Sequence, residues 1–380
     1  MDFEFTREQE DIARAAREFA QKEFSERAEE FDRDETFDSA IHKKAAELGL
    51  VGVYISEKYG GAGLGIVEQC ILHEEFSAVD FGCGGAIISS CFGSEIIHEF
   101  GSEEQKSRYL PLLTGGDAIM GCALTEPDAG SDLAAARTLA VRDGEEFVIN
   151  GSKMFITNGT IADFVLCFAV TDPKNSDIHS RHSMIIVERN REGFEANKLR
   201  GKLGFRASDT GELSFNNVRV PCSNIVGREG KGFAEAMYLF NLNRIGMAAQ
   251  AVGIARAAID ESLRHVKKRM AFGRPLSAYQ SIQFKLADMY TMMRAGRGMV
   301  YEAAWRIDQG KPDRKLVAAT KAFCGRMGVE CADMALQMHG GYGYLSEYKV
   351  QRLYRDAKLI EIYEGTTEIE KLIVAKELLG

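Results

Sequence analysis

One carboxylate near the end of the chain stands where acid–base chemistry is feasible. Glu364 is followed by Gly365, Thr366 and Thr367, directly before the amphipathic segment 369–375. A hydroxyl residue suits the start of a helix, where free N–H groups can hold a phosphate or a polarised oxygen. The same run fits an ordinary helix start with a solvated glutamate, which on local grounds is the more common case. The rest of the chain must decide between a catalytic base and a surface residue.

Two earlier loops carry groups able to hold a cofactor. The segment 122–132 contains Thr125, Gly130 and Ser131, which offer hydroxyl and backbone N–H donors to a pyrophosphate or to the edge of a planar ring. About 30 residues later, the segment 153–159 reads Lys-Met-Phe-Ile-Thr-Asn-Gly. From the residues alone, each segment fits a turn-rich loop without a ligand equally well.

Composition excludes several classes of function. The chain has 380 residues, a length that predicts two or three structural units. Because 45% of its residues are hydrophobic and only six are proline, we expect it to fold. A net charge of −9 argues against a nucleic-acid-binding surface. No apolar run reaches the ~18 residues of a membrane span, and the acidic start Met1-Asp2-Phe3-Glu4-Phe5 is unlike a signal peptide. We therefore expect a cytoplasmic protein without a membrane span.

The cysteines and histidines show no spacing typical of a metal site. The eight cysteines lie in apolar contexts without a Cys-x-x-Cys pair, which favours reduced core residues over ligands or disulfides. We expect no bound metal.

The segments that must position these loops fall into three blocks. Capping boxes that begin at Thr6 and Ser102, with apolar residues at helical spacing, predict helices up to about residue 115, two of them over 67–77 and 86–100. Between residues 120 and 221 the chain turns to alternating β-rich runs. Asp143-Gly144 and Asn150-Gly151 are hairpin-type turn signals there. From residue 230 onward long amphipathic runs return, over 233–266, 279–307, 313–339 and 350–358.

These blocks predict an α+β multidomain fold. We expect an all-helical N-terminal domain over residues 1–117 and a middle domain over 118–226, built as an antiparallel β-barrel or sandwich. A C-terminal four-helix bundle is expected over 227–380.

Six motifs, in order, resemble the acyl-CoA dehydrogenase family along essentially the whole chain. Each is moderately specific alone, and six with family-like spacing are very specific. The resemblance implies the same helical, β, helical architecture and FAD as the cofactor. The motifs are Thr125-Glu126-Pro127-x-Ala129-Gly130-Ser131-Asp132, Ile156-Thr157-Asn158-Gly159, Arg269-x-x-Phe272-Gly273, Gln337-x-x-Gly340-Gly341, Arg355-Asp356-Ala357 and Tyr363-Glu364-Gly365-Thr366.

The resemblance implies a first group of FAD contacts in the β block. Thr125 matches the strand beside the flavin ring, and Thr157 matches the hydroxyl that hydrogen-bonds flavin N5. Phe155 stands where many relatives carry tryptophan, so the aromatic wall of the flavin is kept but smaller. The whole group is Cys122, Leu124, Thr125, Gly130, Ser131, Phe155, Ile156 and Thr157.

A second group is implied to reach the pyrophosphate and adenine end of FAD from another subunit. Thr366 and Glu368 match further FAD contacts, the latter where relatives often have glutamine, and Ala271 stands where relatives supply a hydroxyl. Contacts that span two subunits imply a homotetramer, a dimer of dimers. The second group is Arg269, Phe272, Gln280, Gln337, Gly340 and Gly341.

For the substrate, the resemblance implies an acyl-CoA thioester with Glu364 as the catalytic base. A minority of the family carries its base at the position of Asn243, and asparagine cannot accept a proton. Arg244 is implied to hydrogen-bond the CoA moiety. The implied substrate contacts are Ser131, Asn241, Asn243, Arg244 and Gly365.

The implied reaction is α,β-dehydrogenation in fatty acid β-oxidation. Glu364 removes the α proton, flavin N5 takes the β hydride, and electrons pass to an electron-transfer flavoprotein, leaving a trans-2-enoyl-CoA. The rival functions are an acyl-CoA oxidase, a lyase-like relative and a non-catalytic acyl-CoA-binding protein.

The acyl group is constrained by the segment 83–90, which by analogy lines the far end of the pocket. It carries no arginine or lysine, so an apolar, short to medium, branched or cyclic acyl chain is favoured over a dicarboxylic one. Glycines 82, 84 and 85 either enlarge this cavity or allow close packing of helices.

Overall fold

The computed structural model describes residues 4–380, so residues 1–3 of the acidic start lie outside it. The first block is helical, as predicted, and both capping boxes are formed, by Thr6 with Gln9 and by Ser102 with Gln105. Its helices are α1 (Arg7–Glu23), α2 (Ala28–Asp34), α3 (Ser39–Glu47), α4 (Ile66–Val79), α5 (Phe81–Ile88), α6 (Ser94–Phe100) and α7 (Glu103–Thr114), with 3-10 turns η1 (Glu57–Tyr59) and η2 (Ser89–Cys91).

The single helix predicted over 86–100 is wrong, because the chain breaks between α5 and α6. Gly93 adopts a left-handed φ of 100°, which a continuous helix cannot contain. Its N–H donates to Oε2 of Glu95 at 3.0 Å.

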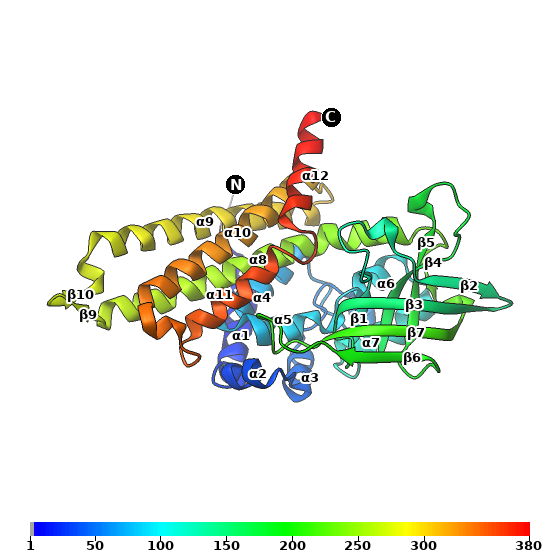
Figure 1. The fold of residues 1–380 in the computed structure, drawn as a ribbon, viewed down its shortest axis with the longest axis horizontal. Helices are drawn as coiled ribbons and strands as arrows, with labels where there is room; N and C mark the ends of the chain where they lie inside the picture. Colours follow the sequence, from blue (N-terminus) through cyan, green and yellow to red (C-terminus); the bar gives the residue numbers. More distant parts are fainter. Residues whose placement is uncertain (1–3) are drawn as a thin grey trace.

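The middle block forms one eight-stranded sheet in the order β6-β7-β3-β2-β4-β5-β8, with β1 beside β4 (Figure 1). Most pairs are antiparallel, as expected, but β1 runs parallel to β4. The strands are β1 (Met120–Ala123), β2 (Leu139–Asp143), β3 (Glu146–Thr157), β4 (Phe164–Val170), β5 (His182–Glu188), β6 (Phe194–Lys198), β7 (Thr210–Pro221) and β8 (Ile225–Val226), with 3-10 turns η3 (Leu133–Ala135), η4 (Ile178–Ser180) and η5 (Cys222–Asn224).

Of the two predicted hairpin turns, only the first is a turn. Asp143 pairs with Glu146 across the loop that contains Gly144, at a φ of 64°. Asn150-Gly151 lies inside the long strand β3 instead, where the register against β7 shifts. A β-bulge and a hairpin both accept glycine at unusual backbone angles, so the dipeptide alone did not distinguish them.

The four long C-terminal helices agree with the predicted ranges and pack as a bundle. Helix α8, with 37 residues, is about 55 Å long and reaches from the bundle to the sheet (Figure 1). None of the helices within residues 4–380 is long and apolar enough to cross a membrane. The elements are α8 (Gly232–Lys268), β9 (Met270–Ala271), β10 (Arg274–Pro275), η6 (Leu276–Ala278), α9 (Gln280–Asp308), α10 (Arg314–His339), η7 (Gly340–Tyr344), α11 (Lys349–Ile360) and α12 (Thr367–Leu379).

A buried carboxylate joins the bundle to the loop that precedes β7. Asp356 on α11 accepts a hydrogen bond from the N–H of Phe205 at 2.7 Å. Close by, Nε of Arg352 pairs with Oδ2 of Asp80 at 2.8 Å. Burial, reinforced by the charge of Asp80, raises the pKa of Asp356 to about 7.

Asp356→Asn should therefore gain stability relative to wild type as the pH rises. The folded wild type keeps the Asp356 proton up to about pH 7, whereas the unfolded chain loses it near pH 4, so ionisation opposes folding across that interval. Urea midpoints of both holoproteins, compared between about pH 5 and pH 8, measure the difference. A difference that stays constant with pH contradicts the account.

Candidate functional site

Glu364 lies in a tight turn between α11 and α12. Glu364 and Gly365 have φ values of 54° and 100°, both in the left-handed region. Thr366 begins α12 as its N-cap, with Oγ1 accepting from the N–H of Ile369 at 3.4 Å, so the predicted helix start is confirmed. The backbone N–H groups of Glu364 and Gly365 have no backbone acceptor among residues 4–380. The turn therefore presents two donors and one carboxylate.

Glu364 is half-buried, and one of its carboxylate oxygens is withdrawn from solvent. Its Oε2 atom is buried and has no hydrogen-bond partner in the described part of the chain. Burial raises the pKa of Glu364 to about 7, against the opposing effect of Arg244 and Lys321. Glu95 and Glu370 raise it further. A solvated surface glutamate would show none of these features.

Three charged side chains lie beneath the turn, each on a different helix. Lys321 of α10 donates from Nζ to the carbonyl oxygen of Gly365. Arg244 of α8 donates from Nε to the carbonyl oxygen of Glu364 at 3.3 Å. The same Nε lies 2.9 Å from Oε1 of Glu370 on α12. Arg244, expected to contact the CoA moiety, is thus buried against the turn.

Lys321 and Glu370 escaped prediction from the sequence. A charged residue within an amphipathic helix is usually assigned to the solvated face. The helical spacing could have indicated that Lys321 is buried, because it lies on the same side of α10 as Val317, Cys324 and Gly328, which are all buried. The hydrogen bond from Lys321 to the carbonyl oxygen of Gly365 explains why a lysine occupies this buried position.

The first predicted cofactor group surrounds the end of β1 and the bulged end of β3. The loop after β1 is fixed from β3, since the N–H of Met154 donates to the carbonyl of Thr125 at 2.9 Å. Buried Lys153 donates to the carbonyl of Leu124 at 2.9 Å and pairs with Glu126 at 2.8 Å. Gly130 and Ser131 are exposed on the same loop.

The bulge gives Phe155 its unusual orientation. The register between β3 and β7 shifts between Lys153 and Ile156, and Phe155 takes a φ of 61°. Its ring is 67% exposed while Ile156 is buried. Thr157 follows at the end of the strand, and neither its hydroxyl nor that of Thr125 has a partner within residues 4–380. An exposed aromatic ring and two hydroxyls without partners among these residues therefore lie on the bulged end of β3 and on the loop after β1.

This group lies within electrostatic reach of Glu364. Burial raises the pKa of the Cys122 thiol, and the charges of Glu364 and Glu95 raise it further. The structure thus brings the predicted base and β1 together.

On α8, the structure gives Asn243 a protein partner. Nδ2 of Asn243 donates to Oε1 of Glu95 at 3.1 Å, and both residues are buried. Asn241 is half-buried one turn before Arg244. Glu95 is a second carboxylate near the base that the sequence did not point to.

Glycines 84 and 85 resolve one alternative left open by the sequence. A Cβ on Gly84 would lie 2.6 Å from Cβ of Phe76, and one on Gly85 would lie 2.5 Å from the ring of Phe205. These glycines allow close packing around α5, and the interpretation as a roomier cavity is not supported at either position.

The second predicted cofactor group lies elsewhere in the same chain. Figure 1 places the β9–β10 hairpin at one end of the molecule and the large sheet at the other. Phe272 in this hairpin is 97% exposed, and the guanidinium of Arg269 lies 5.3 Å from the ring centre of Tyr342. One chain does not bring the two groups together. The exposed members are Arg269, Phe272, Gln280, Gln337, Gly340 and Gly341, and Glu368 is exposed on α12.

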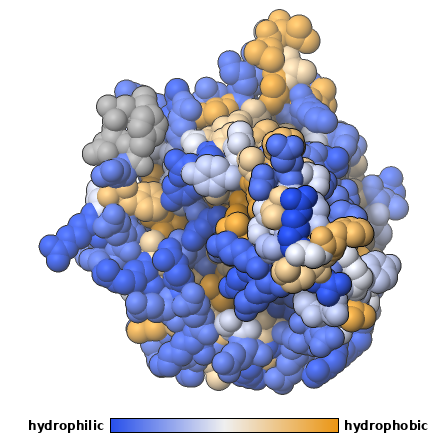
Figure 2. Space-filling view, turned by 90° about the vertical axis from the view of Figure 1, so that its left-hand side faces the viewer, coloured by the Kyte–Doolittle hydropathy of each residue, from blue (hydrophilic) through white to orange (hydrophobic). Residues whose placement is uncertain are grey.

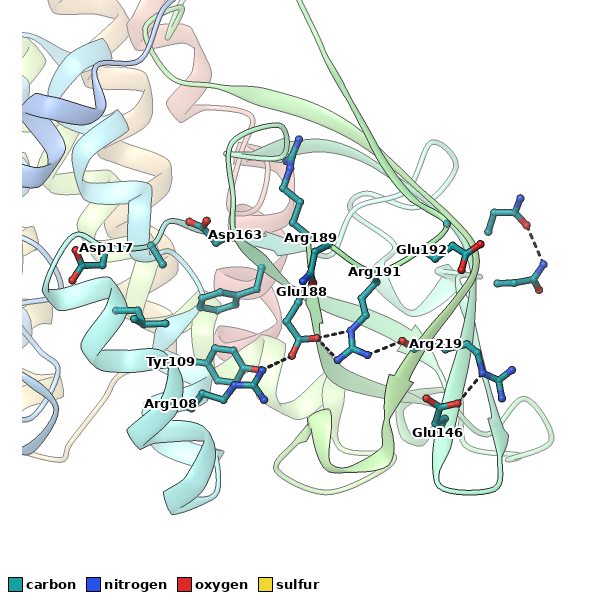
Figure 3. A pocket seen from close by; sticks show the side chains of 17 residues that line it. Arg108, Tyr109, Asp117, Glu146, Asp163, Glu188, Arg189, Arg191, Glu192 and Arg219 are labelled. Carbon is teal, nitrogen blue, oxygen red and sulfur yellow. Dashed lines mark hydrogen bonds and ion pairs between the residues drawn. The ribbon is translucent and has the colours of Figure 1, made fainter.

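A charged groove between α7 and the sheet contains none of the predicted site residues (Figure 3). Its charges bind one another. Glu188 accepts from the hydroxyl of Tyr109 at 2.8 Å and from Nε of Arg191 at 2.9 Å, and it lies 3.1 Å from Arg108. This groove offers no counterpart of the buried, unpartnered oxygen of Glu364.

Comparison with known proteins identifies the family. Residues 6–117, 121–218 and 230–379 match the N-terminal, middle and C-terminal domains of acyl-CoA dehydrogenase. The chain is 43% identical to an acryloyl-CoA reductase (NADH) of Anaerotignum propionicum, over 100% of this chain and 96% of that protein. Butyryl-CoA dehydrogenase from Megasphaera elsdenii superposes with a TM-score of 0.95 at 38% identity, over 100% of both chains.

A further solved chain belongs to a structure on the electron transferring flavoprotein of Acidaminococcus fermentans and flavin-based electron bifurcation. It superposes with a TM-score of 0.96 at 39% identity, again over 100% of both chains. The fold, the three matched domains and these relatives agree: this chain is an FAD-dependent enzyme of the acyl-CoA dehydrogenase family.

Proposed function

We propose that the chain catalyses α,β-dehydrogenation of a short, apolar acyl-CoA to the trans-2-enoyl-CoA, with Glu364 as the base. One observation carries this proposal: Oε2 of Glu364 is buried, has no hydrogen-bond partner among residues 4–380, and belongs to a carboxyl group whose pKa is raised to about 7. A base with a pKa near the working pH is well matched to proton abstraction.

The turn supplies both groups that this proton transfer needs. The α C–H of a thioester becomes acidic when its carbonyl oxygen is polarised, and the free N–H groups at Glu364 and Gly365 are suitable donors. The Glu364 carboxylate then takes the α proton. Since Oε2 is shielded from water, the carboxylate keeps its basicity until the substrate arrives.

The residues around the turn fit FAD, which when bound supplies the acceptor for the β hydride. The hydroxyls of Thr125 and Thr157, which have no partner within residues 4–380, suit the polar edge of the flavin, and the exposed ring of Phe155 suits its face. Arg269 and Gln280 offer donors for the pyrophosphate from a neighbouring subunit.

The relatives support a proposal for the acyl preference and for the electron acceptor. The likeness to butyryl-CoA dehydrogenase and the tight packing at Gly84 and Gly85 support a short acyl chain. The likeness to a chain in an electron-transferring-flavoprotein structure supports that protein as the acceptor. We also propose a cytoplasmic location, which fractionation of cells would test. For the pathway, we propose fatty acid β-oxidation.

The reverse reaction is a second candidate, favoured by the likeness to an acryloyl-CoA reductase (NADH). A carboxyl group with a pKa of about 7 can return a proton to the α carbon as readily as it removes one. Reduction of the flavoprotein acceptor by butyryl-CoA supports the dehydrogenase. NADH oxidation that depends on an enoyl-CoA, without acceptor reduction by butyryl-CoA, supports the reductase.

Glu364→Gln should abolish proton abstraction while it preserves the fold and bound FAD. We expect anaerobic flavin bleaching by butyryl-CoA to slow by ~10³-fold or more, the upper part of the range for acid–base catalysis. Glu377→Gln, which removes an exposed charge from the same helix α12, is the matched control and should bleach at the wild-type rate. A Glu364→Gln enzyme that bleaches at a near-normal rate refutes the assignment.

Gly365→Ala should misplace the base. A Cβ at this position would lie 2.2 Å from Oε1 of Glu370, at a φ of 100° that alanine rarely adopts. We expect at least ~10²-fold slower bleaching with FAD retained. Gly144→Ala is the control, because its φ of 64° is also left-handed but no atom lies within 4 Å of the added Cβ. Equal effects of the two substitutions would show strain alone and would count against the role of the turn.

We infer a homotetramer in which the second cofactor group completes the FAD site of a neighbour. Apolar side chains are exposed on the β9–β10 hairpin and on α12, including Phe272 and Leu378. Figure 2 shows hydrophobic atoms on the protruding part of the molecule that carries α12. Such exposed groups are typical of a subunit interface.

Phe272→Asp should therefore weaken assembly and FAD retention together. Sedimentation, with flavin absorbance recorded on each species, measures both quantities. Val141→Asp is the control, since Val141 is 50% exposed on β2 and belongs to neither predicted group. A Phe272→Asp protein that remains a tetramer with full FAD overturns the inference.

A further inference from the structure

We propose that Lys321 and Glu370 are positioning residues: two buried residues of opposite charge that hold the turn carrying Glu364 and set the electrostatic environment of its carboxylate. The proposal rests on the proposed function, because it concerns how the base is held. Neither residue lies in any motif that led to the family.

The geometry places this pair directly against the turn. Lys321 is 1% exposed and donates from Nζ to the carbonyl of Gly365. Glu370 is 0% exposed, and its Oε1 lies so close to Gly365 that an added Cβ would be only 2.2 Å away. Arg244 forms an ion pair with Glu370 and also donates from Nε to the carbonyl oxygen of Glu364, at 3.3 Å. Both carbonyls of the turn are thereby held by cations from the bundle.

The turn requires such support. A glutamate at a φ of 54° occupies a region that L-residues with side chains avoid, and it persists only where surrounding contacts fix it. Helix packing alone would be served by apolar residues at these positions, because buried charges are unfavourable without partners. Because the charged groups of Lys321 and Glu370 contact the turn, we infer that they do more than fill space between helices.

The contact between Arg244 and Glu370 is mainly electrostatic. Their atoms are 2.9 Å apart, yet neither oxygen of Glu370 accepts a hydrogen bond of regular geometry within residues 4–380. Burial raises the pKa of Glu370, while Arg244 and Lys321 oppose this shift. The charge of Glu370 therefore acts on its neighbours through space.

The charged groups that face Glu364 come from four helices. Arg244 on α8 and Lys321 on α10 lower the pKa of Glu364, whereas Glu95 on α6 and Glu370 on α12 raise it. Lys321 interacts electrostatically with Glu370, Glu364, Arg244 and Glu361. Removing the negative charge of Glu370 should make Glu364 a stronger acid, and removing the positive charge of Lys321 should make it a weaker one.

The test compares Glu370→Gln, Lys321→Met and the double variant as FAD-bound enzymes. The first readout is the rate of anaerobic flavin bleaching by butyryl-CoA against pH, which rises as Glu364 loses its proton. We expect this rise to move to lower pH in Glu370→Gln and to higher pH in Lys321→Met, by about 0.5–1 pH unit each. The double variant should return toward wild type. Glu377→Gln on the exposed side of α12 should leave the profile unchanged.

A second readout does not depend on turnover. Infrared difference titration of each holoenzyme follows the protonated carboxyl band that is absent from Glu364→Gln, and its midpoint should shift in the same two directions. A merely structural role would slow both variants without opposite shifts, and that result overturns the proposal. If Lys321→Met does not fold, Glu370→Gln decides alone: a shift to lower pH supports the proposal and an unchanged midpoint overturns it.

The two hypotheses fail in different ways. A wild-type enzyme that no acyl-CoA bleaches at any pH contradicts the proposed function, while the infrared titration still judges the positioning pair. A wild-type enzyme that bleaches normally, with variants whose midpoints coincide with it, contradicts the positioning pair alone.

Discussion

The arrangement of the site depends on buried charge beneath a strained turn. Two successive left-handed residues place the Glu364 carboxylate in the same turn as two backbone N–H groups that have no backbone acceptor among residues 4–380. Lys321, Arg244 and Glu370 hold that turn from three helices. Without the two cations the carbonyl oxygens of the turn would be buried and poorly paired, which is unfavourable in a protein interior. The bundle therefore serves as the support of the reactive group.

The same support connects the base to the sheet. Helix α8 carries Arg244 beneath the turn and Asn243 against Glu95, which lies near the strand β1. Helix α8 thus contacts both the turn that carries Glu364 and a residue near β1, the strand that precedes the loop of Thr125. In the proposed reaction, proton removal and hydride transfer occur on neighbouring carbons of one substrate, which requires a fixed relation between bundle and sheet.

Much of the fold could be predicted from the sequence because its signals are local. The capping boxes at Thr6 and Ser102 and the long helical periods describe contacts within one helix, and the structure contains them. Local signals were insufficient at Gly93, where a continuous helix was predicted, and at Gly151, where a hairpin turn was predicted. A glycine marks an unusual backbone angle, but tertiary context decides whether it breaks a helix or forms a bulge.

The site was harder to predict where it depends on distant contacts. Resemblance to the family predicted Glu364 as the catalytic base, but charge and spacing did not lead to Lys321, Glu370 or Glu95. Each looks like an ordinary helical charge until another helix packs against it. The separation of the β9–β10 hairpin from the large sheet is likewise not evident from the sequence, since it follows from the length of the bundle (Figure 1).

The central claim is that Glu364 removes the α proton in the step that reduces FAD. The most direct measurement is the rate of anaerobic flavin reduction by butyryl-CoA labelled with deuterium at the α carbon, compared with unlabelled substrate and with Glu364→Gln. The account predicts slower reduction with the labelled substrate in the wild type and almost none in the variant. The claim would be contradicted if flavin reduction is fast, proceeds at the same rate with labelled and unlabelled substrate, and is retained in Glu364→Gln.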